Sequence, residues 1–135
     1  MHPATKELIE QYYDFFNRKN KNGFMSLLDD NVVHDINQGT REIGKDVFSA
    51  FIDRMNHSYD EKITHLVIMI NEDGSRASAE FIVEGTYLAT DKGLPEAKHQ
   101  HYQLPCGAFF EIRNHKIMRV TNYYNLQDWL KQVAT

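Results

Sequence analysis

Apolar side chains recur with helical spacing near the start of the chain. Ile9, Tyr12, Tyr13 and Phe16 fall at i, i+3, i+4 and i+7, which places them on one face of a helix. The polar run 17–22 follows directly. The pattern predicts an amphipathic helix that ends at this run.

Three further segments have the same spacing. Asn22 is expected to cap a short second helix, Gly44 precedes a third, and Asn125 is expected to cap the last one. Their predicted inward side chains are, helix by helix, Phe24, Leu27 and Leu28; Val47, Phe48, Phe51, Ile52 and Met55; and Leu126, Trp129, Leu130 and Val133.

Between the third and last helices the spacing changes to two, which predicts strands. The tight turns 71–74 and 113–115 indicate that consecutive strands pair antiparallel. The order helix, helix, strand, helix and then four strands predicts an α+β fold, in which a curved antiparallel sheet packs on three N-terminal helices and a short C-terminal helix follows. The four predicted strands are 61–70, 76–90, 98–113 and 116–124. Because the helices are too short to cover this sheet, we expect it to enclose a cavity.

Composition narrows the class of protein. With 135 residues, 41% hydrophobic and 25% charged, the chain fits a single domain, 1–135. A net charge of -4 argues against a nucleic-acid partner. The absence of a long apolar run argues against a membrane partner, and a cytoplasmic location is expected. Cys106 is the only cysteine, which excludes an internal disulfide, and it is expected to be a small buried apolar side chain.

The order of elements, together with the tail GAFFEIRNHKIMRVTNYYNLQDW, carries a family resemblance. It resembles the SnoaL-like and ketosteroid-isomerase-related branch of the nuclear-transport-factor-two-like superfamily over nearly the whole chain. The resemblance implies a cone-shaped, cystatin-like α+β barrel with a hydrophobic pocket, and a homodimer formed through the outer face of the sheet. Because this superfamily includes isomerases, cyclases, dehydratases and binding proteins, the fold does not name a reaction.

The stretch VVHDINQG, residues 32–39, ends a short apolar strand in an acid. Similarity to steroid isomerases matches Tyr12 with their donor tyrosine and, when one residue is deleted between the two, Asp35 with their general base. With one further deletion, Ala108 stands where they carry a protonated Asp. The resemblance turns Asp35 into the cavity, and burial there would raise its pKa and make it a better proton acceptor near neutral pH. Its predicted aromatic neighbours are Phe48, Phe51 and Phe81.

Structural alternatives stay open for both residues. Asp35, Asn37 and Gly39 could form an Asx-type turn without any chemistry. Tyr12 belongs to an apolar stripe, and such aromatic side chains are often part of the core.

The last two predicted strands contribute further pocket residues. The alternation that points Val120 inward also points Asn122 and Tyr124 inward, where their polar tips could bind a ligand and replace the donor missing at Ala108. Alternatively, Asn122 pairs with the helix cap at Asn125 and Tyr124 with backbone. Alternation on the preceding strand adds Ala108, Phe110 and Tyr102 to the predicted pocket, next to Phe51 and Phe81.

His99 and His101 alternate on one strand face, a spacing that two metal ligands could use. A third ligand is not apparent, so neither a metal nor another cofactor is expected. Strand alternation turns both outward, where His101, Phe109 and Tyr123 would favour a partner, unless a bulge at Pro105 or Gly107 shifts it.

The sequence therefore favours a protein that binds a small hydrophobic or carbonyl-containing compound, an isomerase or cyclase with Asp35 as general base and Tyr12 as donor. The alternatives are a ligand-binding module without catalysis and a dehydratase of the same fold, which would need His99 or His101 to face the cavity.

Overall fold

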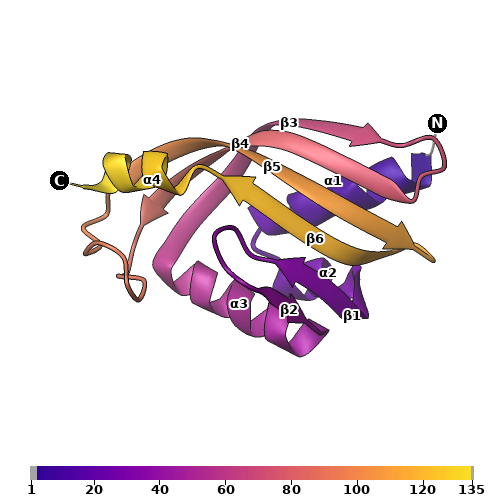
Figure 1. Cartoon of the computed structure of the whole chain (residues 1–135), viewed down its shortest axis with the longest axis horizontal. Helices are drawn as coiled ribbons and strands as arrows, with labels where there is room; N and C mark the ends of the chain where they lie inside the picture. Colours follow the sequence, from indigo (N-terminus) through magenta and orange to yellow (C-terminus); the bar gives the residue numbers. More distant parts are fainter. Residues whose placement is uncertain (1–2, 135) are drawn as a thin grey trace.

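The computed structural model describes residues 3–134 and has an α+β fold. The helices and strands follow one another in the predicted order, with one additional short strand, β2 (Figure 1). In chain order they are α1 (Pro3–Asn17), α2 (Lys21–Ser26), β1 (Leu28–Asp35), β2 (Arg41–Ile43), α3 (Lys45–Ser58), β3 (Tyr59–Ile70), β4 (Arg76–Tyr87), β5 (His101–Arg113), β6 (Lys116–Tyr124) and α4 (Leu126–Val133).

The strands form a single curved sheet in the order β2-β1-β6-β5-β4-β3. The strands β3 to β6 pair antiparallel with their neighbours in sequence, as predicted, and β1 pairs antiparallel with β2, whereas β1 and β6 pair parallel. Because β2 and β3 lie at opposite edges, the sheet curves around its contents without closing. The helices α1 and α3 pack on the sheet, and α4 contacts β5 (Figure 1).

Some predicted details differ from the structure. Asn20, not Asn22, caps α2, because its side chain accepts a hydrogen bond from the Gly23 backbone N–H at 2.9 Å. Val47 is 39% exposed on α3 and does not belong to the buried stripe. The strand β2 was not predicted, since three residues are too few to show an alternating pattern.

Two side-chain amides form hydrogen bonds with backbone N–H and C=O groups at the margins of the sheet. Asn17, at the end of α1, donates to the Ile63 carbonyl at 3.0 Å and accepts from the Ile63 N–H at 2.7 Å. Gln132 of α4 forms the same pair of bonds with Gln103, both at 2.9 Å. Because each amide satisfies a donor and an acceptor that would otherwise be open to a further strand, it fixes a helix against the sheet.

No helix within residues 3–134 is both long enough and apolar enough to cross a bilayer. The cytoplasmic location stays a prediction.

Candidate functional site

A cavity of about 480 Å³ lies between the inner face of the sheet and the helices. Its wall is mainly aromatic and aliphatic, and all four helices contribute to it. Prominent apolar members are Tyr12, Tyr13, Phe24, Phe48, Phe51, Phe81, Leu104 and Trp129. An apolar hollow with a few polar groups is typical of small-molecule sites.

His34 of β1 is one of these polar groups. Its imidazole stacks on Phe48 with ring centroids 4.2 Å apart and meets Phe51 edge-on at 4.6 Å. Burial lowers the pKa of His34 to about 4, against a smaller opposing effect of the Asp35 charge. The ring is therefore neutral at pH 7. Its Nδ1 atom is buried without a hydrogen-bond partner among the described residues.

Asp35 lies on the opposite face of β1 from His34. The Arg41 side chain donates to its two oxygens from Nε at 2.6 Å and Nη2 at 3.0 Å, and the Thr121 hydroxyl donates at 2.6 Å. These bonds, with the Arg41 bond the strongest influence, lower the pKa of Asp35 to about 2. The predicted orientation of Asp35 and its predicted raised pKa are therefore both wrong.

Strand pairing explains this correction. His34 lies beside Val120 of β6 on the buried inner face, whereas Asp35 lies beside Thr121 on the outer face. Matching Asp35 to the steroid-isomerase base required the deletion of one residue. Because strand side chains alternate with a period of two, a shift of one residue moves a side chain to the other face. A general base must be sought elsewhere on the cavity wall.

Two adjacent tyrosines of α1, Tyr12 and Tyr13, reach the cavity from the helical side. Their rings meet edge-to-face with centroids 5.0 Å apart. Burial raises the pKa of each phenol, so both remain protonated and able to donate. The Tyr13 hydroxyl, like His34 Nδ1, is buried without a hydrogen-bond partner in the described part of the chain.

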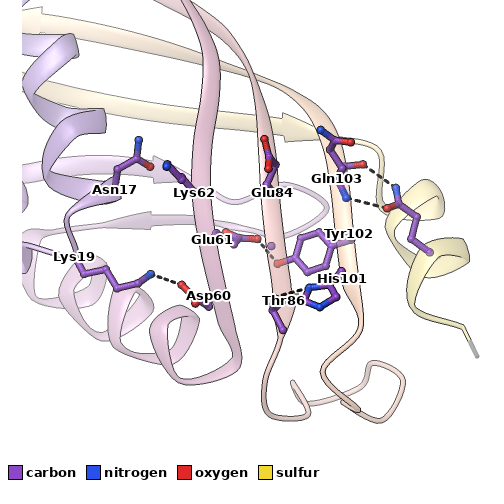
Figure 2. Close-up of a pocket in the computed structure, with 12 residues that line it drawn as sticks. Asn17, Lys19, Asp60, Glu61, Lys62, Glu84, Thr86, His101, Tyr102 and Gln103 are labelled. Atoms are coloured by element: carbon purple, nitrogen blue, oxygen red, sulfur yellow. Dashed lines mark hydrogen bonds and ion pairs between the residues drawn. The ribbon is translucent and has the colours of Figure 1, made fainter.

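Glu61 of β3 also lines the cavity, and the sequence analysis did not identify it. The Tyr102 hydroxyl donates to its Oε2 atom at 2.5 Å (Figure 2). Burial raises the pKa of Glu61, and the Tyr102 bond opposes that effect. One signal was available, because Glu61 stands two residues before the buried Ile63 and so shares its strand face.

The model of the SnoaL-like domain matches residues 9–120. The chain belongs to this family. No curated protein matches it.

Solved structures agree with the SnoaL-like assignment. A candidate polyketide cyclase from Pseudomonas putida KT2440 is 54% identical, with a TM-score of 0.95 over 98% of this chain and 99% of that one. One from Xanthomonas campestris is 48% identical, with a TM-score of 0.93 over 96% of each chain. An NTF2-like protein from Burkholderia xenovorans, 9% identical, has a TM-score of 0.78 over 98% of each chain and shares the fold.

The SnoaL-like cavity brings together only part of the predicted pocket. Tyr12, Phe51, Phe81, Asn122 and Tyr124 line it. Three other predicted residues are buried but are not among the residues that line the cavity: Val120, Ala108 and Phe110. Tyr102 points toward Glu61 (Figure 2). Binding or catalytic roles for these residues stay predictions.

Neither His99, which precedes β5 instead of lying on a strand as predicted, nor His101, which begins β5, lines the SnoaL-like cavity. Both are exposed, and His101 Nδ1 lies 2.9 Å from the Thr86 hydroxyl. The dehydratase alternative, which needed His99 or His101 to face the cavity, therefore has no support in the structure. Within residues 3–134 there is no group of three or more His, Cys, Asp or Glu side chains placed to hold a metal ion.

Proposed function

We propose that this SnoaL-like protein binds a small, largely apolar carbonyl compound and promotes its isomerisation or cyclisation by moving a proton on a carbon next to the carbonyl. One observation carries the proposal: His34 and Tyr13, two residues that line the cavity, each hold a buried polar atom, Nδ1 and the hydroxyl oxygen, that has no hydrogen-bond partner among the described residues. A buried polar group without a partner costs roughly 1–3 kcal/mol, so such groups call for a functional explanation. A ligand that supplies the missing hydrogen bonds is that explanation.

The state of both groups suits a carbonyl oxygen. A neutral imidazole carries one N–H donor and one acceptor nitrogen, and a protonated phenol is a donor. When a proton leaves the carbon next to a carbonyl, negative charge develops on the oxygen, and prearranged donors stabilise that charge. The relatives from Pseudomonas putida and Xanthomonas campestris, named as candidate polyketide cyclases, support chemistry of this class.

Binding of the bicyclic ketone 1-tetralone tests the proposal. Tyr13→Phe and His34→Phe are each expected to weaken binding roughly 2- to 10-fold, since a neutral hydrogen bond contributes about 0.5–1.5 kcal/mol. Neither change should lower the stability of the ligand-free protein at pH 8, because each removes an unpartnered polar atom. Calorimetric titration measures the affinity and thermal unfolding measures the stability.

The matched control is Thr40→Val, which removes a hydroxyl from an exposed side chain that does not line the cavity. If all three variants bind 1-tetralone as tightly as the wild type, the two unpartnered groups do not serve the ligand. Binding without any exchange of the ketone's α-protons for deuterium would instead favour a ligand-binding module without catalysis.

We also propose that two copies of the chain associate through the outer face of the sheet. Several large apolar side chains gather there although they are exposed: Val67 (49%), Met69 (47%), Phe109 (47%) and Tyr123 (57%). The Phe109 and Tyr123 rings already contact each other, with centroids 5.9 Å apart. A monomer rarely leaves such an apolar patch open to water.

The double variant Phe109→Glu/Tyr123→Lys is therefore expected to be monomeric at micromolar concentration, where the wild type is dimeric. Sedimentation equilibrium measures the mass. The control Val47→Lys places a charge on α3, away from the outer sheet face, and should leave the dimer intact. A wild-type protein that is monomeric at all concentrations would contradict the dimer.

A further inference from the structure

Three residues on adjacent strands lie in line across the inner face of the sheet. Gly85 of β4 is the pairing partner of Glu61 on β3 and of Tyr102 on β5. Glu61 and Tyr102 are therefore two strands apart, yet the Tyr102 hydroxyl reaches the Glu61 carboxyl group at 2.5 Å (Figure 2). The phenol crosses the intervening strand directly over the glycine.

The absence of a side chain at position 85 makes this contact possible. A Cβ atom on Gly85 would lie 2.3 Å from Tyr102 Cζ and 2.4 Å from its hydroxyl oxygen. Real Cβ atoms do not come so close to another atom. Glycine is thus required here by the close approach of a side chain, and the notch it leaves holds the phenol against the carboxyl group.

Charged neighbours have little net effect on the pKa of Glu61. Burial is the main influence and raises its pKa, while the Tyr102 bond lowers it, Lys19 lowers it and Asp60 raises it. Lys19 and Asp60 form an ion pair with each other at 2.9 Å, so their effects oppose one another. Burial and the phenol therefore dominate.

The charge of the Glu61 carboxyl group raises the pKa of polar groups on the neighbouring cavity wall. After burial, its charge is the next cause that raises the pKa of Cys106 to about 12 and the pKa of Tyr124. Both of these residues line the cavity. Glu61 thus faces the same enclosed space as the proposed ligand.

Glu61 and Lys19 also line a polar groove of about 660 Å³ on the surface. In Figure 2 the Glu61 and Tyr102 side chains point toward each other at this groove, near the Lys19–Asp60 pair. Glu61 therefore borders the cavity on one side and solvent on the other. This position gives a proton taken up in the cavity a route to water.

We propose that Glu61 is the catalytic base of the cavity and that Tyr102, seated over Gly85, is its positioning residue; this inference rests on the proposed function. The Glu61 carboxylate takes a proton from the carbon next to the ligand carbonyl. The C–H electron pair becomes the new carbon–carbon π bond, and the carbonyl π pair moves onto oxygen, which His34 or Tyr13 hydrogen-bonds. In a ligand with a carbon–carbon double bond β,γ to the carbonyl, the enolate is a conjugated dienolate, and the resulting carboxylic acid returns the proton to its γ carbon, which completes an isomerisation.

The exchange of α-protons of 1-tetralone in deuterium oxide, followed by proton NMR, tests this role. Glu61→Gln keeps the shape of the side chain and removes the base, so we expect exchange above the protein-free rate to fall roughly 10²- to 10⁴-fold. Binding of 1-tetralone should be retained within a few-fold. The matched control Glu84→Gln changes an exposed carboxyl group of the same groove and should leave exchange unchanged.

The variant Tyr102→Phe tests the positioning role through the pH dependence of exchange, which would not change if Tyr102 were purely structural. The phenol stabilises the ionised carboxylate, so its removal raises the pKa of Glu61, and the pH at which exchange reaches half its maximum should move upward. The maximal rate at high pH should largely recover. A pH profile that keeps its position would contradict the positioning role of Tyr102.

The outcomes separate the two proposals. If the wild type does not bind 1-tetralone, the proposed function fails and the role of Glu61 fails with it. If the wild type binds without exchange, the binding part of the proposed function stands, but its catalytic part and the role of Glu61 both fail. If the wild type exchanges and Glu61→Gln exchanges as fast, only the role of Glu61 is overturned.

Discussion

Replacing Gly85 by alanine is expected to destabilise the fold by about 1–3 kcal/mol and to separate Tyr102 from Glu61. The new Cβ atom would overlap the Tyr102 ring, which it would approach to 2.3 Å. The ring cannot simply move aside, because Tyr102 is 5% exposed and packs edge-on against Trp129 with centroids 6.0 Å apart. The strain must therefore be taken up by the backbone of β4 or by the aromatic cluster around Trp129.

Urea denaturation measures this cost, and a double-mutant cycle assigns it to the ring. In a Tyr102→Ala background the clash is absent, so Gly85→Ala should cost much less there, which gives a coupling energy of about 1 kcal/mol or more. Gly107→Ala is the matched control, because its Cβ would meet only the Ala79 carbonyl oxygen at 3.8 Å, an ordinary contact. If alanine at Gly85 and at Gly107 lowered the free energy of unfolding equally, the loss at Gly85 would not come from a clash with the Tyr102 ring.

The helices and long strands could be predicted because each carries a repeated local signal. The stripe at i, i+3, i+4 and i+7 in α1 and the alternation along β4 each extend over many residues, so one exception does not hide the pattern. The parallel pairing of β1 with β6 has no such signal. Those strands are distant along the chain, so no local pattern reports their relative direction.

The candidate site was less predictable because it depends on single residues. Whether His34 or Asp35 faces the cavity is decided by one step of strand register, and the assumed match to the steroid isomerases contained a deletion of that size. A partly buried carboxyl group with a raised pKa does line the cavity, but it is Glu61. Its partner Tyr102 is 41 positions away in the chain, and the intervening Gly85 is meaningful only once the three strands are paired.

The buried imidazole of His34 should make the stability of the protein depend on pH between about 4 and 6.5. The folded-state pKa of His34 is lowered from 6.5 to about 4, so within this window the unfolded chain binds a proton that the folded chain does not. Stability therefore falls as the pH is lowered through the window. At about 1.4 kcal/mol for each pH unit, the shift corresponds to a loss of about 3 kcal/mol.

Two carboxyl groups also have shifted pKa values, but neither lowers the stability as the pH falls from 6.5 to 4. The lowered pKa of Asp35 gives stability that is lost only below pH 3.8, as the pH falls toward about 2. The raised pKa of Glu61 gives stability that is present below 4.5 and lost as the pH rises, which is the opposite sign. The difference in the free energy of unfolding between the wild type and a His34 variant, taken at each pH, therefore reports the protonation of the imidazole alone.

His34→Phe keeps an aromatic ring stacked on Phe48 and removes the titrating group. We expect the free energy of unfolding of this variant, measured in urea at a series of pH values, to exceed that of the wild type increasingly from pH 6.5 to 4, by about 3 kcal/mol at the lower end. Val32→Ala is the control, because it removes buried apolar volume from the same face of β1 and should lower stability by a similar amount at every pH. Parallel curves for wild type and His34→Phe would mean that the imidazole protonates as easily in the folded protein as in the unfolded chain, and that burial does not lower the pKa of His34.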